Sequence, residues 1–282
     1  MTPLLPNRTV AGQKLALQLK PYTNRSDVIV LALPRGGVPV AFEIAKILAL
    51  PLDICLVRKL GLPDSPETAM GAIATGDLMI LNENLLPSLE VAPHIFAQIL
   101  AMEKEELLRR NRVYRKNRPF SQIRERTIIL VDDGMATGST IRAALTVLKK
   151  QQPQSIIIAV PVAPPSICQQ LKAEVDNIVC LLQPENLYSI STWYEKFPQT
   201  TDAEVLELLQ IASSFPIGLS LMELSPENSQ NASKSAKVLK NRHRVGLPDP
   251  LFARLKLLSN EQKRPMNQIL AEALSAYLNK QS

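Results

Sequence analysis

The sequence predicts an α/β protein in which a mostly parallel β-sheet is flanked by helices, followed by a small C-terminal strand-helix-helix module. In the first two-thirds of the chain, short apolar runs alternate with amphipathic stretches, a pattern typical of βα units. The runs are nearly continuous and rich in β-branched residues, as expected for strands that are covered on both faces. After residue 212 this periodicity fades, and it returns only after residue 241.

The elements follow from these patterns in order along the chain. The expected strands are the apolar runs Val28–Leu33, Leu52–Val57, Thr127–Val131, Ile156–Val160 and Asn177–Leu182. The expected helices have apolar residues at helical spacing: Val38–Leu50, Phe96–Arg115, Ser139–Lys150, Pro165–Ala173 and a last one from the cap Thr201 to Ala212. In the long polar helix, acidic residues precede arginines, which suits the helix dipole. We therefore expect this helix to be exposed to solvent. The alternative is that its arginines bind a phosphorylated acceptor.

The net charge of +6 is concentrated at the C-terminal end, where residues 234–282 contain ten basic and three acidic side chains. Such an asymmetry predicts a separate module with an anionic partner. Before it, the Ser/Asn-rich composition around 225–235 predicts a flexible linker. The expected organisation is a domain over 1–212, a linker over 213–241 and the module over 242–282.

The three cysteines, Cys55, Cys168 and Cys180, lie within or beside apolar segments. An odd number with wide spacing argues against a disulfide framework or a zinc site, so we expect reduced thiols and a cytoplasmic protein. No apolar run approaches the ~18 residues that a membrane-spanning helix needs, so no membrane partner is expected.

One run combines an apolar strand, two adjacent carboxylates, a loop of small residues and a helix start. Its members are Asp132, Asp133, Gly134, Met135, Ala136, Thr137, Gly138, Ser139 and Thr140. Vicinal ribose hydroxyls need neighbouring acceptors, which the two aspartates supply. A glycine-containing turn into a helix N-terminus offers backbone N–H donors to a phosphate. The alternative is that this run is an ordinary strand-turn-helix connection in which an aspartate caps the helix. The run has no lysine where a P-loop needs one and no Gly-x-Gly-x-x-Gly, so nucleoside-triphosphate and dinucleotide sites are disfavoured.

This run resembles the signature of type I phosphoribosyltransferases that binds 5-phosphoribosyl-1-pyrophosphate (PRPP). Two further segments resemble family elements over roughly residues 8–211: Leu33–Pro39, similar to the pyrophosphate-binding loop, and Val57–Pro63 continuing through Glu67, similar to the flexible catalytic loop. The pattern is most similar to bacterial members with an unassigned acceptor. The resemblance implies the type I phosphoribosyltransferase fold, a PRPP-binding site that includes Pro34, Arg35, Gly36 and Gly37, and, within the pyrophosphate-binding loop, often a non-proline cis peptide.

The resemblance also implies chemical roles. Arg35, Arg58, Lys59 and Glu67 are the expected catalytic residues, with the cations facing the leaving pyrophosphate and Glu67 as a candidate base. Mg²⁺ is the implied cofactor, held by Asp132 and Asp133 mostly through water, which suits this metal. Ala136 stands where the 6-oxopurine enzymes have an aspartate, so hypoxanthine and guanine are disfavoured as acceptors. The acceptor itself cannot be deduced from the sequence.

The basic C-terminal module resembles the ribbon-helix-helix family of DNA-binding proteins. An alternating segment over 242–247 precedes two amphipathic helices, and one copy is too small to bury its own core, so a homodimer is expected. Arg242 and Arg244 are the expected DNA contacts. Gly246 and Pro265 depart from the family pattern.

Two functions from different classes follow. The first is an enzyme that transfers the phosphoribosyl group from PRPP to a small-molecule acceptor and releases pyrophosphate. The alternative is a transcriptional regulator that senses PRPP and binds DNA through the C-terminal module. A module that only dimerises is a third possibility. The Arg58–Lys59 pair and Glu67 favour the enzyme, because a sensor has no need of groups that act on the leaving group.

Overall fold

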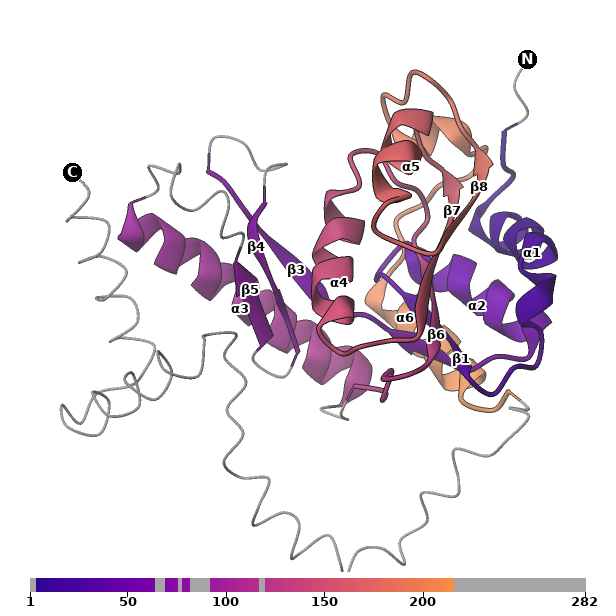
Figure 1. Cartoon of the computed structure of the whole chain (residues 1–282), viewed down its shortest axis with the longest axis horizontal. Helices are drawn as coiled ribbons and strands as arrows, with labels where there is room; N and C mark the ends of the chain where they lie inside the picture. The colour runs from indigo at the N-terminus through magenta and orange to yellow at the C-terminus, as the bar shows by residue number, and fades with distance from the viewer. Residues whose placement is uncertain (1–3, 64–68, 76–77, 82–91, 117–119, 216–282) are drawn as a thin grey trace, which may run out of the picture.

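The computed structural model describes residues 4–63, 69–75, 78–81, 92–116 and 120–215 (Figure 1). Its main sheet has five strands, all parallel, in the order β2-β1-β6-β7-β8. Their bounds are β1 Val28–Ala32, β2 Leu52–Ile54, β6 Thr127–Val131, β7 Ser155–Val162 and β8 Asn177–Leu182. The predicted α/β class with a parallel sheet is confirmed.

Both faces of the parallel sheet are covered, as the continuous apolar runs predicted. Two helices on one side are α1, Arg8–Gln18, and α2, Gly37–Leu48, and two on the other are α4, Ser139–Lys149, and α5, Pro165–Leu171 (Figure 1). Alternate residues of β1 divide between the two sides because a strand has a period of two: Val28, Val30 and Ala32 join the α1–α2 core, while Ile29 and Leu31 join the α4–α5 core.

A second, antiparallel sheet corrects the expectation of one strand over Leu52–Val57. The chain leaves the main sheet after β2, and β3, Val57–Gly61, pairs instead with β4, Ala69–Ala74, which pairs with β5, Leu78–Leu81. The long helix α3, Pro93–Arg115, and α4 both contact β3 and β4. Of the segment expected to be a flexible loop, Val57–Gly61 is therefore strand. In the sequence the apolar run extends past the end of β2, because residues 54–56 are buried where the chain passes from one sheet to the other.

The remaining elements of the described residues are two short 3₁₀ helices, η1 at Lys20–Tyr22 and η3 at Ile190–Trp193, and one further α-helix, α6, Asp202–Ala212. The segment after β8 returns to the N-terminus, where Leu5 forms a parallel bridge with Tyr194. Helix α1, which had no predicted counterpart, is capped by the Asn7 side chain and packs against α2.

The predicted module and all but the first three residues of the predicted linker lie outside the described residues, so the division at 212 stays a prediction. The described domain reaches at least Phe215, whose ring packs on Phe42 at a centroid distance of 5.2 Å. Cys55, Cys168 and Cys180 are all free thiols. Within the described ranges, no helix is both long and apolar enough to cross a membrane.

Candidate active site

The site forms where two neighbouring parallel strands end side by side. Ala32 of β1 is the register partner of Val131 of β6, and the Leu33 backbone N–H donates to the Val131 carbonyl at 2.8 Å. The chain runs from β1 into α2 on one face of the sheet and from β6 into α4 on the other. Loops that diverge in this way leave a crevice at the carboxyl edge, the usual ligand site of open parallel sheets.

The two loops that sequence analysis singled out touch each other at this edge. A Cβ atom on Gly36 would lie 1.9 Å from Oδ2 of Asp133, and one on Gly37 would lie 2.7 Å from the Val131 carbonyl oxygen. Gly36 has φ −61° and ψ −32°, which any residue adopts. Glycine is therefore required at 36 for close approach and not for backbone freedom.

The peptide bond between Pro34 and Arg35 is cis, as the resemblance led us to expect. One nitrogen of the Arg35 guanidinium, NH1, lies 3.5 Å from Oδ1 of Asp202 on α6. On the other residue of the bond, the Pro34 carbonyl accepts a hydrogen bond from NH1 of Arg110 on α3 at 3.4 Å. Helices outside the sequence motif thus contact both residues of this peptide.

The Asp133 carboxylate is held by a buried arginine from α1. Arg8 donates from Nε to Asp133 Oδ2 at 2.8 Å, and its NH2 lies 2.7 Å from the same oxygen. Its NH1 donates to the Pro198 carbonyl at 2.6 Å, and its guanidinium lies 3.7 Å from the Phe197 ring centroid. The Tyr194 hydroxyl donates to the Asp133 backbone carbonyl at 2.7 Å. Asp133 is therefore fixed in place before any ligand arrives.

Burial disfavours the ionised form of both aspartates. Burial, and then the neighbouring Asp133, raise the pKa of Asp132 well above its usual value. The pKa of Asp133 is also raised by burial, although the Arg8 guanidinium acts in the opposite direction. Oδ1 of Asp132 accepts the Asp133 backbone N–H at 2.9 Å. The strand end thus holds two adjacent carboxyls in a site where bound cations or hydroxyl donors would stabilise their charge.

The loop after the aspartates leads into α4 through Gly138, whose φ of +74° belongs to the left-handed region that favours glycine. Ala136, Thr137 and Thr140 are exposed there, and the Thr137 and Ser139 hydroxyls lie 3.0 Å apart. Met135 faces inward, with a 2 % exposed side chain and a backbone N–H that donates to Val162. A Cβ on Gly134 would meet the Ile190 side chain of η3.

The cations of β3 point in opposite directions because neighbouring strand residues alternate. Lys59 Nζ donates to Ser139 Oγ at 3.0 Å, which brings it to the start of α4. Arg58 Nε instead donates to Glu103 Oε2 on α3 at 2.5 Å. Only Lys59 of this pair is therefore placed at the loop between β6 and α4, and Arg58 lies on the α3 side of the sheet.

The sequence argument missed Arg8, Tyr194 and Asp202, which contact the predicted site from elements distant in the chain. Nothing in their local sequence marks them, apart from the placing of Asp202 directly after the helix cap Thr201. Three predicted site residues, Glu67, Arg242 and Arg244, lie outside the described residues.

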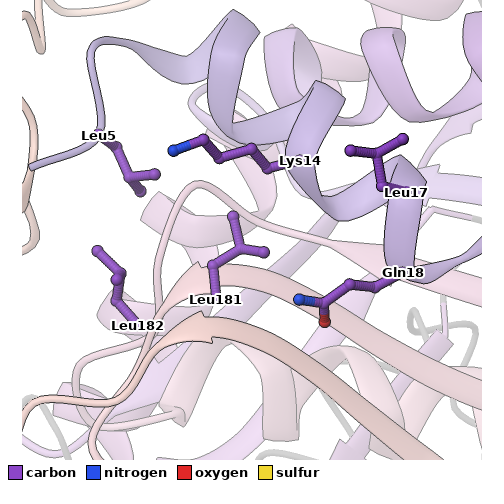
Figure 2. Close-up of a pocket in the computed structure, with 6 residues that line it drawn as sticks. All are labelled: Leu5, Lys14, Leu17, Gln18, Leu181 and Leu182. Carbon is purple, nitrogen blue, oxygen red and sulfur yellow. The ribbon is translucent and has the colours of Figure 1, made fainter. Parts of the chain in front are cut away.

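A separate cavity of about 330 Å³ lies between α1 and β8 (Figure 2). Its lining residues are Leu5, Lys14, Leu17, Gln18, Leu181 and Leu182. This lining has no acidic side chain and only Lys14 as a charged group. It does not offer the paired acceptors and turn donors found at the ends of β1 and β6, where we place the site.

A family model and several known proteins match most of the described domain. A family model described as "Phosphoribosyl transferase domain" matches residues 5–186. Two Mycobacterium tuberculosis proteins, named "Putative phosphoribosyl transferase" MT0597 and Rv0571c, are each 37% identical over 209 residues, covering 74% of this chain and 47% of theirs. The chain thus spans about half the length of the curated relatives it matches. The crystal structure of TT1426 from Thermus thermophilus is similar with 36% identity and a TM-score of 0.66, covering 73% of this chain and 97% of that one.

Proposed function

Because the chain belongs to the phosphoribosyl transferase domain family, we propose that it transfers the 5-phosphoribosyl group from PRPP to a small-molecule acceptor, with release of pyrophosphate. The observation that supports this most is the contact between the two loops at the ends of β1 and β6. It joins the paired aspartates to the Gly36–Gly37 turn within one site. Neither loop alone provides both hydroxyl acceptors and a close backbone approach.

In the proposed site each part of PRPP has a matching surface. Asp132 and Asp133 accept from the ribose hydroxyls, and the 5′-phosphate lies over the turn and first residues of α4, where Thr137, Ser139 and Thr140 add hydroxyl donors. The pyrophosphate lies along Pro34–Gly37. The remaining residues of the run, Gly134, Met135, Ala136 and Gly138, shape the loop.

The reaction breaks the bond between ribose C1 and the pyrophosphate oxygen, and the bonding electrons leave with pyrophosphate. The transition state resembles an oxocarbenium ion, so the protein acts by positioning and by stabilising charge on the departing oxygens. We assign this second role to Lys59, Arg35 and Arg58; in this structure Lys59 Nζ donates to Ser139 Oγ, beside the turn proposed for the 5′-phosphate. An acceptor nitrogen then bonds to C1, and Glu67 is the candidate base for its proton.

Mg²⁺ is the proposed cofactor, and the donor set fits it. The described residues contain no group of three or more His, Cys, Asp or Glu side chains that could enclose a metal. Two adjacent carboxylates suit Mg²⁺, which keeps several waters and binds through one or two protein carboxylates together with substrate phosphates. Asp132 and Asp133 would hold its hydration shell, and the ion would neutralise charge on pyrophosphate.

The acceptor class is narrowed by Ala136, which is exposed on the loop and has no group that exchanges a proton. We therefore propose an acceptor other than hypoxanthine or guanine. A cytoplasmic homodimer remains our expectation. The DNA-binding regulator depends on Arg242 and Arg244, and no feature of the described residues favours it over the enzyme.

Calorimetry tests the proposal directly. Titration of the full chain with PRPP and Mg²⁺ should give saturable heat, and pyrophosphate should be released when the correct acceptor is supplied from a panel of nitrogenous bases. The Asp133→Asn variant should lose both signals. Absence of PRPP heat from a chain shown to be folded by circular dichroism would refute the proposal.

Replacement of Lys59 with methionine should lower kcat about tenfold with little change in thermal stability. A charge-assisted hydrogen bond contributes about 1.5–3 kcal/mol, and partial exposure favours the lower end, which corresponds to roughly tenfold in rate. Lys20→Met is the matched control, because Lys20 is exposed and belongs to η1, between α1 and β1. Equal turnover by the two variants would show that Lys59 does not act on the leaving group.

A further inference from the structure

Asp202 contacts the proposed pyrophosphate loop from beyond residues 5–186, the part of the chain that the family model matches. We propose that Asp202 is a positioning residue, which orients Arg35 and so helps to hold the Pro34–Gly37 loop in the shape that receives pyrophosphate. This proposal rests on the proposed function. It assigns a residue that shapes the pyrophosphate loop to α6, a helix outside the three sequence motifs.

The Asp202 carboxylate is itself held by two partners on α3. Its Oδ1 accepts from the Tyr114 hydroxyl at 2.5 Å, and its Oδ2 lies 2.8 Å from NH1 of Arg109. These hydrogen bonds, first that of Tyr114 and then that of Arg109, lower the pKa of Asp202, so it is ionised at neutral pH. The Thr201 hydroxyl caps α6 through the Glu204 backbone N–H at 3.1 Å and fixes the turn that contains Asp202. Arg35 therefore meets an anion whose position is already set.

A second contact holds the same peptide from the other residue. Arg110 donates to the Pro34 carbonyl, and Glu106 accepts from Arg110 Nε at 2.6 Å and from Arg109 Nε at 2.7 Å. Glu106 thus links the arginine that touches Pro34 to the arginine that holds Asp202. The Arg109 side chain is 44% exposed, as expected for a solvated helix, and it also joins α3 to α6, while Arg110 joins α3 to the loop.

The direction of the change in PRPP affinity distinguishes an orienting role of Asp202 from simple electrostatic repulsion. A carboxylate beside a pyrophosphate site repels the ligand, so loss of its charge alone should strengthen PRPP binding. Loss of an orienting contact should weaken binding, because the loop must then be ordered when the ligand binds. The Arg35 and Asp202 side chains are 31% and 32% exposed, so solvent screens the repulsion, and we expect loss of positioning to dominate.

The decisive variant is Asp202→Asn, which keeps the shape of the side chain and removes its charge. We expect the Kd and KM for PRPP to rise about tenfold, with a smaller change in kcat. The control is Glu204→Gln, which makes the same charge change at an exposed position on the first turn of α6 and should leave PRPP affinity unchanged. Unchanged or tighter PRPP binding by Asp202→Asn would overturn the proposal.

A readout without ligand keeps the inference separate from the proposed function. In ¹⁵N-arginine spectra of the full chain, the Arg35 Nε–H signal is identified by its loss in Arg35→Lys. The relaxation of this signal should indicate a rigid Arg35 side chain in wild type and in Glu204→Gln, and a rapidly moving side chain in Asp202→Asn. Wild-type protein that fails to bind PRPP would refute the proposed function alone, and the spectrum would still decide the role of Asp202. Equal Arg35 order in wild type and Asp202→Asn would refute that role.

Discussion

Replacement of Gly36 with alanine should weaken PRPP binding at least about a hundredfold while the protein remains folded. The added Cβ would lie 1.9 Å from Oδ2 and 2.5 Å from Cγ of Asp133, far inside contact distance. The backbone of Gly36 is in the ordinary helical region, so alanine introduces no conformational strain of its own. Either the Asp133 carboxylate or the Pro34–Gly37 loop must move, and both belong to the proposed site. Calorimetric titration with PRPP and Mg²⁺ measures the loss.

Gly134→Ala provides the matched control for this substitution. It adds the same methyl group in the same site, but the atoms it meets, 2.5 to 3.1 Å away, belong to the half-buried side chain of Ile190. The half-buried Ile190 side chain has no charged partner and can shift to accommodate the methyl group, whereas Asp133 is fixed by Arg8. We therefore expect less than about a tenfold loss for Gly134→Ala. Gly36→Ala protein that binds PRPP as well as Gly134→Ala protein would contradict the close contact between the two loops.

Replacement of Arg8 with methionine should lower the free energy of unfolding by about 3 kcal/mol at neutral pH. Removing one partner of a buried ion pair leaves the other charge without compensation, which typically costs about 3–5 kcal/mol. The side chains of Arg8 and Asp133 are only 10% and 14% exposed, and Arg8 also loses its contacts with Phe197 and Pro198. Urea denaturation followed by circular dichroism measures the change.

The destabilisation should depend on pH in a predictable direction. Burial already raises the pKa of Asp133, and Arg8 opposes that rise. Without Arg8, the pKa of Asp133 in the folded state lies further above its value in the unfolded state. Folding then favours the protonated Asp133 carboxyl. The stability that protonation provides is lost as the pH rises through the folded-state pKa. Arg8→Met should therefore be closest to wild type at acid pH and furthest from it at neutral pH.

The exposed pair Arg25–Asp27 supplies the comparison. Nη2 of Arg25 and Oδ2 of Asp27 are 2.6 Å apart, but the two side chains are 43% and 40% exposed. Exposed pairs contribute about 0–1 kcal/mol, so Arg25→Met should be close to wild type. An Arg8→Met protein as stable as Arg25→Met at neutral pH would show that the buried pair contributes nothing to folding.

Local patterns were sufficient for the frame of the molecule. Strands β1, β6, β7 and β8 and helices α2 to α6 lie within a few residues of the predicted ranges, because a buried strand or an amphipathic helix leaves its period in a short window of sequence. The antiparallel sheet was missed, since the residues of β4 and β5 follow no clear alternation. Helix α1 was missed as well, because its buried face includes Arg8 and Gly12 while Leu17 is exposed, so its apolar residues mark no single face.

The sequence by itself determined the fold class, the family resemblance, and the two loops that meet at the carboxyl ends of β1 and β6. Each of these depends on residues adjacent in the chain, whose spacing reflects their local geometry. Only the tertiary structure decided how the site is supported: Arg8 reaches Asp133 across 125 positions, and Asp202 reaches Arg35 from a helix at the other end of the domain. The physical reason is that these partners lie far apart in the sequence, so only the packing of distant segments brings their side chains within reach of each other.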